Sequence, residues 1–141
     1  ALQKRTVDFV APGEQQPEAD HFMDRKNSNS GNTLDHFWRD ARDGGHFSYT
    51  LSINGETDLS LGLRFLGGDR GNRKFDIYID DQKLISVDNT DKWKDQRFQE
   101  VEYKIPNEYL KGKKSVIVRF QSGAGSTAGP VYYVRLLRNS Q

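Results

Sequence analysis

The chain has 141 residues, with 21 lysines and arginines against 20 aspartates and glutamates. This balance excludes the basic stripe that a nucleic-acid-binding surface needs, and no apolar run reaches the length of a membrane span. Cysteine is absent, which excludes disulfides and thiolate metal sites. The length predicts one domain, residues 1–141, and the start at alanine favours a mature form or a piece excised from a longer protein.

The first third of the chain gives mixed structural signals. Thr6–Val10 is a short candidate strand, whereas Ala11–Asp20 holds two prolines and predicts irregular or edge structure. Arg25–Asp35 is rich in asparagine, serine and glycine and predicts a loop. His36–Ala41 predicts a short strand or a turn.

The middle of the chain alternates apolar and polar residues in several runs. His46–Ile53, Asp58–Phe65 and Phe75–Ile79 each place apolar side chains on one face, and Lys83–Val87 follows after a turn. Period-two runs separated by Gly, Asp and Asn are typical of successive antiparallel strands with one buried face. The sequence 67–73 between two of these strands predicts a polar loop.

The last third continues the pattern. Asp88–Asp95 predicts a polar connection, Phe98–Ile105 a strand with a bulge at its start, and Ser115–Phe120 another strand. Ser122–Pro130 predicts a loop, and Val131–Leu137 a final strand. About eight or nine strands without a long helix indicate an all-β protein, an antiparallel sandwich or barrel. We expect the first and last strands to lie side by side.

Signals for catalysis and for metal binding are weak. The chain has no Gly-x-Ser-x-Gly elbow, and no carboxylate pair stands out among its acids, so we expect no enzymatic activity. We expect His21 and His36 to make structural hydrogen bonds rather than a metal site. For Glu14, Glu18 and Asp20 we favour a solvated acidic edge, and the alternative is a calcium ion bound around them. No cofactor is expected.

The loop 67–73 concentrates hydrogen-bonding groups, namely Asp69, Arg70, Asn72 and Arg73. It is not a phosphate loop, because a strand rather than a helix follows the glycines. Sugars are bound by such planar polar groups beside an aromatic face. The other interpretation is that Asp69 and Asn72 shape the turn and Arg73 pairs with a neighbouring carboxylate.

Three aromatic residues are candidates for that face. Trp38 lies in a strand-like run and predicts sheet packing, whereas Trp93 stands between Lys92 and Lys94 and predicts an exposed ring. Tyr78 falls on the outward face of its strand. The candidate ligand-binding residues are therefore Asp69, Arg70, Asn72, Arg73, Trp93 and Tyr78.

Several blocks of the sequence together resemble one known module. They are Arg5–Phe9, Pro12–His21, Trp38–Ala41, Gly45–Tyr49, Gly71–Ile77 and Ala128–Tyr132. Across nearly the whole chain the sequence is similar to the C-terminal β-sandwich domain of β-L-arabinofuranosidase-type glycoside hydrolases, family 127 and relatives, best known from Bacteroidetes. His46 departs from the pattern, because an aromatic such as tryptophan is expected there.

The resemblance implies a jelly-roll, galactose-binding-like fold and export to the periplasm or the cell surface. It carries over no catalytic residue, because those of the family lie in a barrel outside this module. It also implies service to a glycan-degrading enzyme, in which such domains either bind glycan or buttress the enzyme. The function we favour is a non-catalytic accessory module that binds a glycan. The alternative is a structural module that packs on the catalytic domain of its own parent enzyme without binding sugar. The dense polar block Pro12–His21 favours this alternative, because contacts between domains are often polar.

Overall fold

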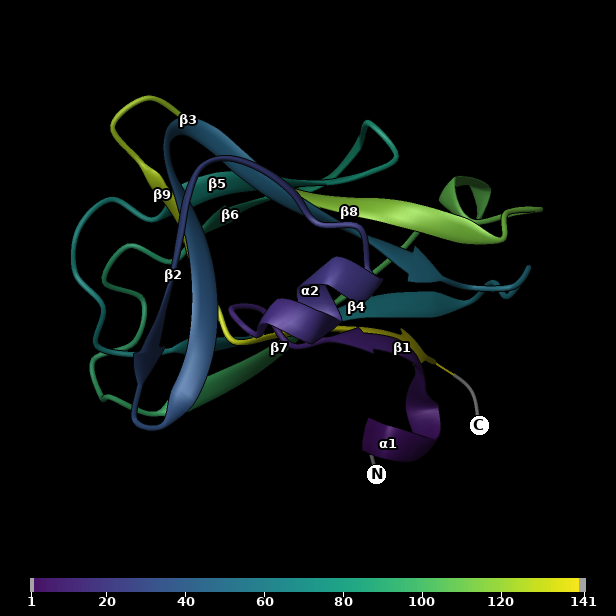
Figure 1. Cartoon of the computed structure of the whole chain (residues 1–141), viewed down its shortest axis with the longest axis horizontal. Coiled ribbons are helices and arrows are strands. Elements are labelled where there is room, and N and C mark those ends of the chain that lie inside the picture. Colours follow the sequence, from purple (N-terminus) through teal and green to yellow (C-terminus); the bar gives the residue numbers. More distant parts are fainter. Residues whose placement is uncertain (1, 140–141) are drawn as a thin grey trace.

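Two antiparallel β-sheets pack face to face in residues 2–139, the part of the chain that this computed structural model describes (Figure 1). One sheet has four strands in the order β1-β10-β4-β7, and the other has six, β2-β3-β8-β5-β6 with β9 paired to β3. The bounds are β1 Thr6–Val10, β2 Asp24–Thr33, β3 His36–Ser52, β4 Leu59–Leu66, β5 Lys74–Ile79, β6 Gln82–Asp88, β7 Phe98–Lys104, β8 Ser115–Ser122, β9 Thr127–Val131 and β10 Tyr133–Arg138. The predicted antiparallel β-sandwich of jelly-roll type is confirmed, with ten strands rather than eight or nine.

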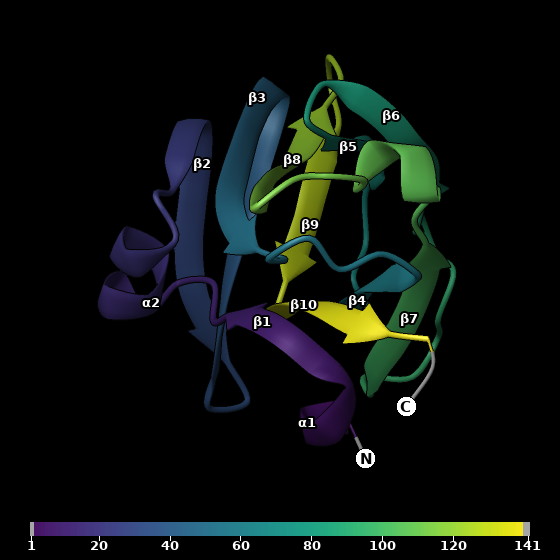
Figure 2. The same cartoon turned by 90° about the vertical axis from the view of Figure 1, so that its right-hand side faces the viewer.

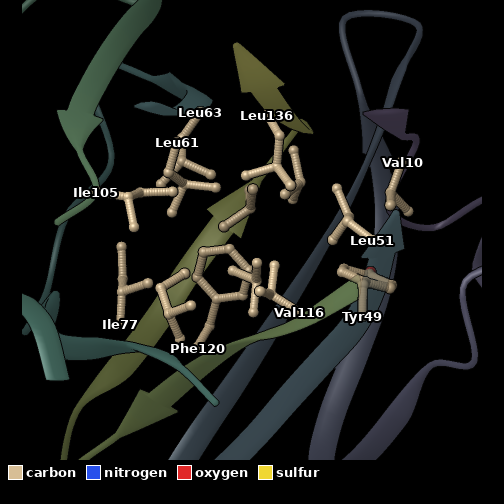
Figure 3. Close-up of a cluster of buried hydrophobic side chains, with 14 of the residues drawn as sticks. Val10, Tyr49, Leu51, Leu61, Leu63, Ile77, Ile105, Val116, Phe120 and Leu136 are labelled. Carbon is tan, nitrogen blue, oxygen red and sulfur yellow. The ribbon is translucent and has the colours of Figure 1, made fainter. Parts of the chain in front are cut away.

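The core lies between the sheets and follows the predicted alternation. Leu61 and Leu63 of β4 face Phe120 of β8 and Tyr49 and Leu51 of β3, and Figure 3 shows these side chains converging from both layers. All five are fully buried. Burial of apolar area on this scale is the main stabilising contribution to such a sandwich.

The first and last strands lie side by side in the four-stranded sheet, as expected. β1 pairs with β10, with Phe9 opposite Arg135 and Val10 opposite Val134. Figure 2 shows these two strands side by side below the other sheet. The predicted bulge at Phe98 is wrong, because β7 pairs with β4 without a register shift. Phe98 belongs instead to the set of side chains that face outward.

The prediction of a loop for Arg25–Asp35 is wrong. This segment forms the edge strand β2 and the turn of a long hairpin with β3. Leu34 and Asp35 both adopt left-handed backbone conformations, with φ of 53° and 61°, as a two-residue hairpin turn requires. Pairing with β3 therefore overrides the low strand propensity of the Asn- and Ser-rich sequence.

Within residues 2–139, three short helical segments complete the fold, α1 (Leu2–Arg5), α2 (Gln15–Asp20) and the 3₁₀ turn η1 (Asn107–Tyr109). The irregular structure predicted for Ala11–Asp20 is thus corrected to a helix over most of that range. Pro17 is compatible with α2 because it lies in the first turn, where a backbone N–H has no helical partner. None of these helices is long and apolar enough to cross a membrane.

Two further boundaries differ from the predictions. His36–Ala41 and His46–Ile53 belong mostly to one continuous strand, β3, which is longer than either. Part of the loop predicted for Ser122–Pro130 forms β9, which pairs with β3. The sequence did not predict this strand because it contains glycine and proline, which are poor strand formers.

Candidate functional site

Two loops lie side by side at one end of the sandwich, on the left of Figure 1. Loop 67–73 joins β4 to β5, and loop 89–97 joins β6 to β7. Backbone hydrogen bonds connect them, because Gly67 N–H donates to Arg97 O at 2.8 Å and Gly68 N–H donates to Trp93 O at 3.0 Å. The loops therefore form one unit whose position is fixed by the ends of the strands.

Gly67 allows this close approach. A Cβ atom at this position would lie 2.2 Å from Asp95 O and 2.9 Å from Trp93 Cβ, distances that no side chain tolerates. The absence of a side chain thus brings the backbone of the second loop, and with it Trp93, against the first. A glycine in this place has a packing reason that the sequence alone does not reveal.

A hollow of about 260 Å³ opens between the two loops. Its walls carry two carboxylates, two cationic side chains and one aromatic ring. The lining residues are Gly68, Asp69, Arg70, Asp91, Trp93 and Lys94. Polar groups that converge beside an aromatic side chain are typical of small-molecule sites.

Trp93 is half-buried, which corrects the expectation of an exposed ring. The indole packs on Phe65 of the core, with ring centroids 6.2 Å apart and planes inclined at 25°. Lys92 Nζ lies 5.0 Å from the centroid of the same ring. Trp93 therefore both anchors its loop to the core and presents the rest of its surface to the hollow.

Asp69 is half-buried and lines both the hollow and a smaller adjoining pocket, which Arg73 and Asn89 also line. Burial raises the pKa of Asp69, the charge of Asp40 raises it further, and the charge of Arg73 opposes both. The Asp69 carboxyl is thus less completely ionised in mild acid than an exposed aspartate. Of the predicted residues, Asp69, Arg70 and Trp93 are brought together in the open hollow.

Hydrogen bonds of Asn72 and Arg73 hold the loop in place. The second interpretation gives such a role to Asp69 and Asn72, and pairs Arg73 with a carboxylate. Asn72 O accepts a hydrogen bond from Thr127 N–H at 3.0 Å, and Arg73 N–H donates to Thr90 Oγ1 at 2.9 Å. Ser126 Oγ also donates to Asn72 Oδ1 at 3.4 Å. Neither Asn72 nor Arg73 lines the open hollow.

Tyr78 lies away from the hollow, which corrects its grouping with the loop residues. It occupies the outer face of the six-stranded sheet, opposite Arg119 in the register of β5 and β8. The Arg119 guanidinium lies 4.4 Å above the Tyr78 ring. Trp38 has the predicted packing role, because its indole covers Gly31 on the neighbouring strand.

Asp91 and Lys94 were missed as site residues. Both lie in the polar connection around Trp93, and only the backbone bonds between the two loops place them opposite Asp69 and Arg70. The sequence signal that could have identified them is the cluster of charged residues around Trp93. A long-range loop contact of this kind has no local sequence pattern.

Two of the three acidic residues proposed for calcium, Glu18 and Asp20, have other partners. Glu18 is buried and accepts two hydrogen bonds from Arg39, so the solvated edge expected there is wrong for this residue. Asp20 accepts a hydrogen bond from Gln16 at 2.8 Å. Within residues 2–139 no group of three or more His, Asp or Glu side chains is arranged to hold a metal ion.

The histidines make the hydrogen bonds expected of them. His21 Nδ1 lies 2.7 Å from Pro17 O, and its Nε2 lies 3.0 Å from Asp8 Oδ1. His36 Nδ1 lies 2.7 Å from Leu34 O. These contacts hold turns and helix ends in place.

Comparison with solved structures gives neighbours of the same architecture. A family 35 carbohydrate-binding module from Clostridium thermocellum superposes with a TM-score of 0.64 at 12% identity, covering 92% of this chain and 98% of that one. The C-terminal family 6 module of a laminarinase from Zobellia galactanivorans gives a TM-score of 0.59 at 11% identity, with 92% and 98% coverage. At these identities the likeness shows the fold alone.

A third neighbour is a larger enzyme. The exo-β-1,3-galactanase of Phanerochaete chrysosporium, solved with β-1,3-galactotriose, matches with a TM-score of 0.66 at 15% identity. The match covers 94% of this chain but 29% of the galactanase. No curated protein matches the chain. A family model described as a family of unknown function, DUF6805, matches residues 1–137, and the chain therefore belongs to that family.

Proposed function

We propose that the protein is a non-catalytic carbohydrate-binding module whose site is the hollow between loops 67–73 and 89–97. The observation that carries the proposal is the meeting of Trp93 with Asp69, Arg70 and Lys94 around one hollow. A sugar ring has an apolar C–H face and a rim of hydroxyls. An indole surface suits the first and fixed charged groups suit the second.

The rigidity of the site supports this function. Trp93 is fixed by its packing on Phe65 and by the hydrogen bond from Gly68. Its side chain therefore loses little conformational freedom when a ligand binds. Association loses less free energy when the side chains are already in place. Hollows of this kind at the ends of sandwich strands are common recognition sites.

The neighbours in known structure support the substrate class. Two of them are named as carbohydrate-binding modules. The third is a galactanase, and the match covers 29% of its chain. On this basis we assign to the chain an accessory role in a secreted glycan-degrading enzyme. We further propose that this parent is a glycoside hydrolase of family 127 type from Bacteroidetes, exported to the periplasm or cell surface, a proposal that the sequence resemblance supports.

A second candidate function is structural, and the outer face of the four-stranded sheet favours it. There Arg135 lies 4.3 Å from the Phe9 ring and 4.8 Å from the Tyr133 ring, and Arg64 lies 4.8 Å from Tyr133 and 5.5 Å from Phe98. Arginine and aromatic side chains, the residue types enriched at protein interfaces, lie next to one another on this face. A module that packs on its parent's catalytic domain would use such a face.

Titration with oligosaccharides separates the two functions. The protein is titrated with arabinan-type and galactan-type oligosaccharides, and amide shifts of Gly68, Asp69 and Trp93 are followed by NMR. Saturable shifts at these residues are expected. We expect a dissociation constant near the millimolar range, which corresponds to a binding free energy of about −4 kcal/mol. Unmoved spectra with every sugar would contradict the proposal and favour the structural role.

Two variants locate the site. Trp93→Ala should abolish the shifts, and Phe37→Ala should preserve them, because Phe37 is an aromatic residue 46% exposed that does not line the hollow. Equal binding by both variants would place the sugar elsewhere.

A further inference from the structure

Phe22 is an aromatic side chain that folding does not explain. It is 74% exposed, and its φ of 52° lies in the left-handed region. It follows the C-cap residue of α2, His21, and its N–H donates to Ala19 O at 3.1 Å. Glycine or asparagine fills this position without strain. A large ring there neither gains burial nor suits the backbone.

Phe22 stands at the edge of a second hollow, of about 450 Å³, on the outer face of the six-stranded sheet. A volume of this size is in the range of small-molecule pockets, about 300–1,000 Å³. The lining residues are Phe22, Asp24, His46, Ser48, Thr50, Asp81, Ile117, Arg119 and Gln121.

The floor of this hollow is built on paired strands. In the register of β3 and β8, Ser48 lies opposite Arg119 and His46 opposite Gln121. Side chains at facing positions of two central strands keep fixed spacing, because the backbone ladder holds both. The backbone ladder therefore makes the floor rigid.

The polar groups on the floor are held in defined orientations. Gln121 Nε2 donates to Gly44 O and Gly45 O, each at 3.0 Å, which directs the amide and leaves its carbonyl oxygen as an acceptor. Arg119 donates from Nη1 to Asp81 at 2.9 Å, and its guanidinium lies 4.4 Å from the centroid of the Tyr78 ring. Tyr78 is thus a support beneath Arg119.

The basic side chains in the hollow have carboxylate neighbours. Arg119 pairs with Asp81, and His46 Nε2 lies 3.3 Å from Asp24 Oδ2. Phe22 and the 47% exposed Ile117 add two apolar surfaces to this polar floor. A ligand rich in hydroxyls and apolar on one face suits these surfaces.

We infer that the outer face of the six-stranded sheet carries a second glycan site, which binds a sugar ring against Phe22. Ser48, Arg119 and Gln121 contact its hydroxyls. This site shares none of the lining residues of the loop hollow. The module thus contacts a polysaccharide at two separate places, and a chain long enough to reach both gains affinity without new contacts.

The test is an NMR titration of the wild-type protein with β-1,3-galactotriose and with arabinan-type oligosaccharides, to about 10 mM, a range that detects weak single-site binding. Two sets of amides report the two sites, His46, Ser48 and Gln121 for the sheet face and Gly68 and Trp93 for the loops. We expect saturable shifts in the sheet-face set with at least one sugar.

Phe22→Ala should weaken the sheet-face binding at least about tenfold and leave the loop set unchanged, whereas Phe22→Trp should restore it. The matched control is Phe37→Ala, which removes another exposed ring. Because Phe22 is exposed, the alanine variant keeps the fold, and its undisturbed spectrum elsewhere verifies this.

Each outcome decides one of the two sites. Shifts in the loop set alone, or unchanged sheet-face binding by Phe22→Ala, would overturn this inference and leave the loop site standing. Shifts in the sheet-face set alone would support it and remove the loop site. Sheet-face signals that move with protein concentration in the absence of sugar would mark an interface between copies of the chain and overturn it as well.

Discussion

Arg39 of β3 and Glu18 of α2 form a buried, bidentate ion pair, with Nε–Oε2 and Nη2–Oε1 distances of 2.6 and 3.0 Å. Tyr49 donates its hydroxyl to the same carboxylate at 2.6 Å, and Arg39 Nη1 donates to Ser28 Oγ at 3.0 Å. Every member of this network is buried. The network joins α2 to both strands of the long hairpin, so it positions the segment from which Phe22 projects.

Glu18→Gln should therefore be strongly destabilising. The amide matches the carboxylate in shape but leaves the Arg39 charge buried without a counter-ion, and breaking such a pair costs about 3–5 kcal/mol. Tyr49→Phe, which removes one hydrogen bond and keeps both charges, should cost less, about 1–3 kcal/mol. Urea unfolding of the two variants measures the difference, and equal losses would mean that the charge pair is not what holds α2.

Stability should fall as the solution is acidified. Burial alone raises the pKa of Glu18, but hydrogen bonds from Arg39, Gly13 and Tyr49 outweigh it and hold that pKa below its ordinary value. Hydrogen bonds from Arg5 and Arg138 likewise lower the pKa values of Glu102 and Glu56. A carboxyl with a lower pKa in the folded state contributes its full stability above the unfolded pKa, about 4.3 for glutamate, and loses it as the pH drops through the folded pKa.

Asp69 acts in the opposite direction, because its raised pKa makes the folded state bind its proton more readily. The three glutamates outnumber it, so the urea midpoint should decrease steadily below about pH 4.3. In Glu18→Gln the decrease should be shallower, since one of the three contributions is already lost. A variant profile parallel to that of the wild type would contradict the assignment to Glu18.

Gly67→Ala tests whether close contact of the two loops builds the candidate site. The added Cβ would meet Asp95 O at 2.2 Å, so the loops must separate, at a cost of about 1–3 kcal/mol for overpacking. Sugar binding in the loop hollow should be lost while the core stays folded. Gly123→Ala is the matched control, because nothing lies within 4 Å of a Cβ there.

The sandwich and most of its strands were predictable, because Phe47, Tyr49 and Leu51 alternate with polar neighbours and one face is buried. The edge strand β2 was not, since only Ser28 of its side chains is buried and its register comes from pairing with β3. Glu18 looked solvated because its partner Arg39 lies 21 residues away.

The same limit applies to the sites. Asp69, Arg70 and Trp93 were identified from their chemistry, but the contact between their loops depends on Gly67, whose role has no sequence signature. Phe22 was overlooked because a single aromatic residue after a polar segment resembles a core residue. Only its exposure and backbone conformation distinguish it.

The turn at Leu34 and Asp35 offers a stabilising substitution. Both residues hold left-handed conformations, which cost roughly 1 kcal/mol or more for ordinary residues, and Leu34 is 53% exposed, so it contributes little burial. Leu34→Asn with Asp35→Gly supplies the preferred residues for this turn and should raise the free energy of unfolding by about 1 kcal/mol. Leu34→Ala serves as the control and should bring no gain, because alanine suits the left-handed conformation no better.

Lys92→Ala should strengthen sugar binding at the proposed loop site, because Lys92 lies against the Trp93 ring. Its ammonium lies 5.0 Å from the ring centroid while Phe65 packs against the same indole, and a sugar that stacks there must displace the lysine. An exposed cation–π contact contributes about 0.5–1 kcal/mol. For an oligosaccharide that binds this site, the dissociation constant of Lys92→Ala should therefore be roughly two- to fivefold lower than that of the wild type. Lys111→Ala, at an exposed lysine outside the hollow, controls for the change in net charge. Weaker binding by Lys92→Ala would mean instead that the ammonium contacts the sugar directly and that the ring is reached from another side.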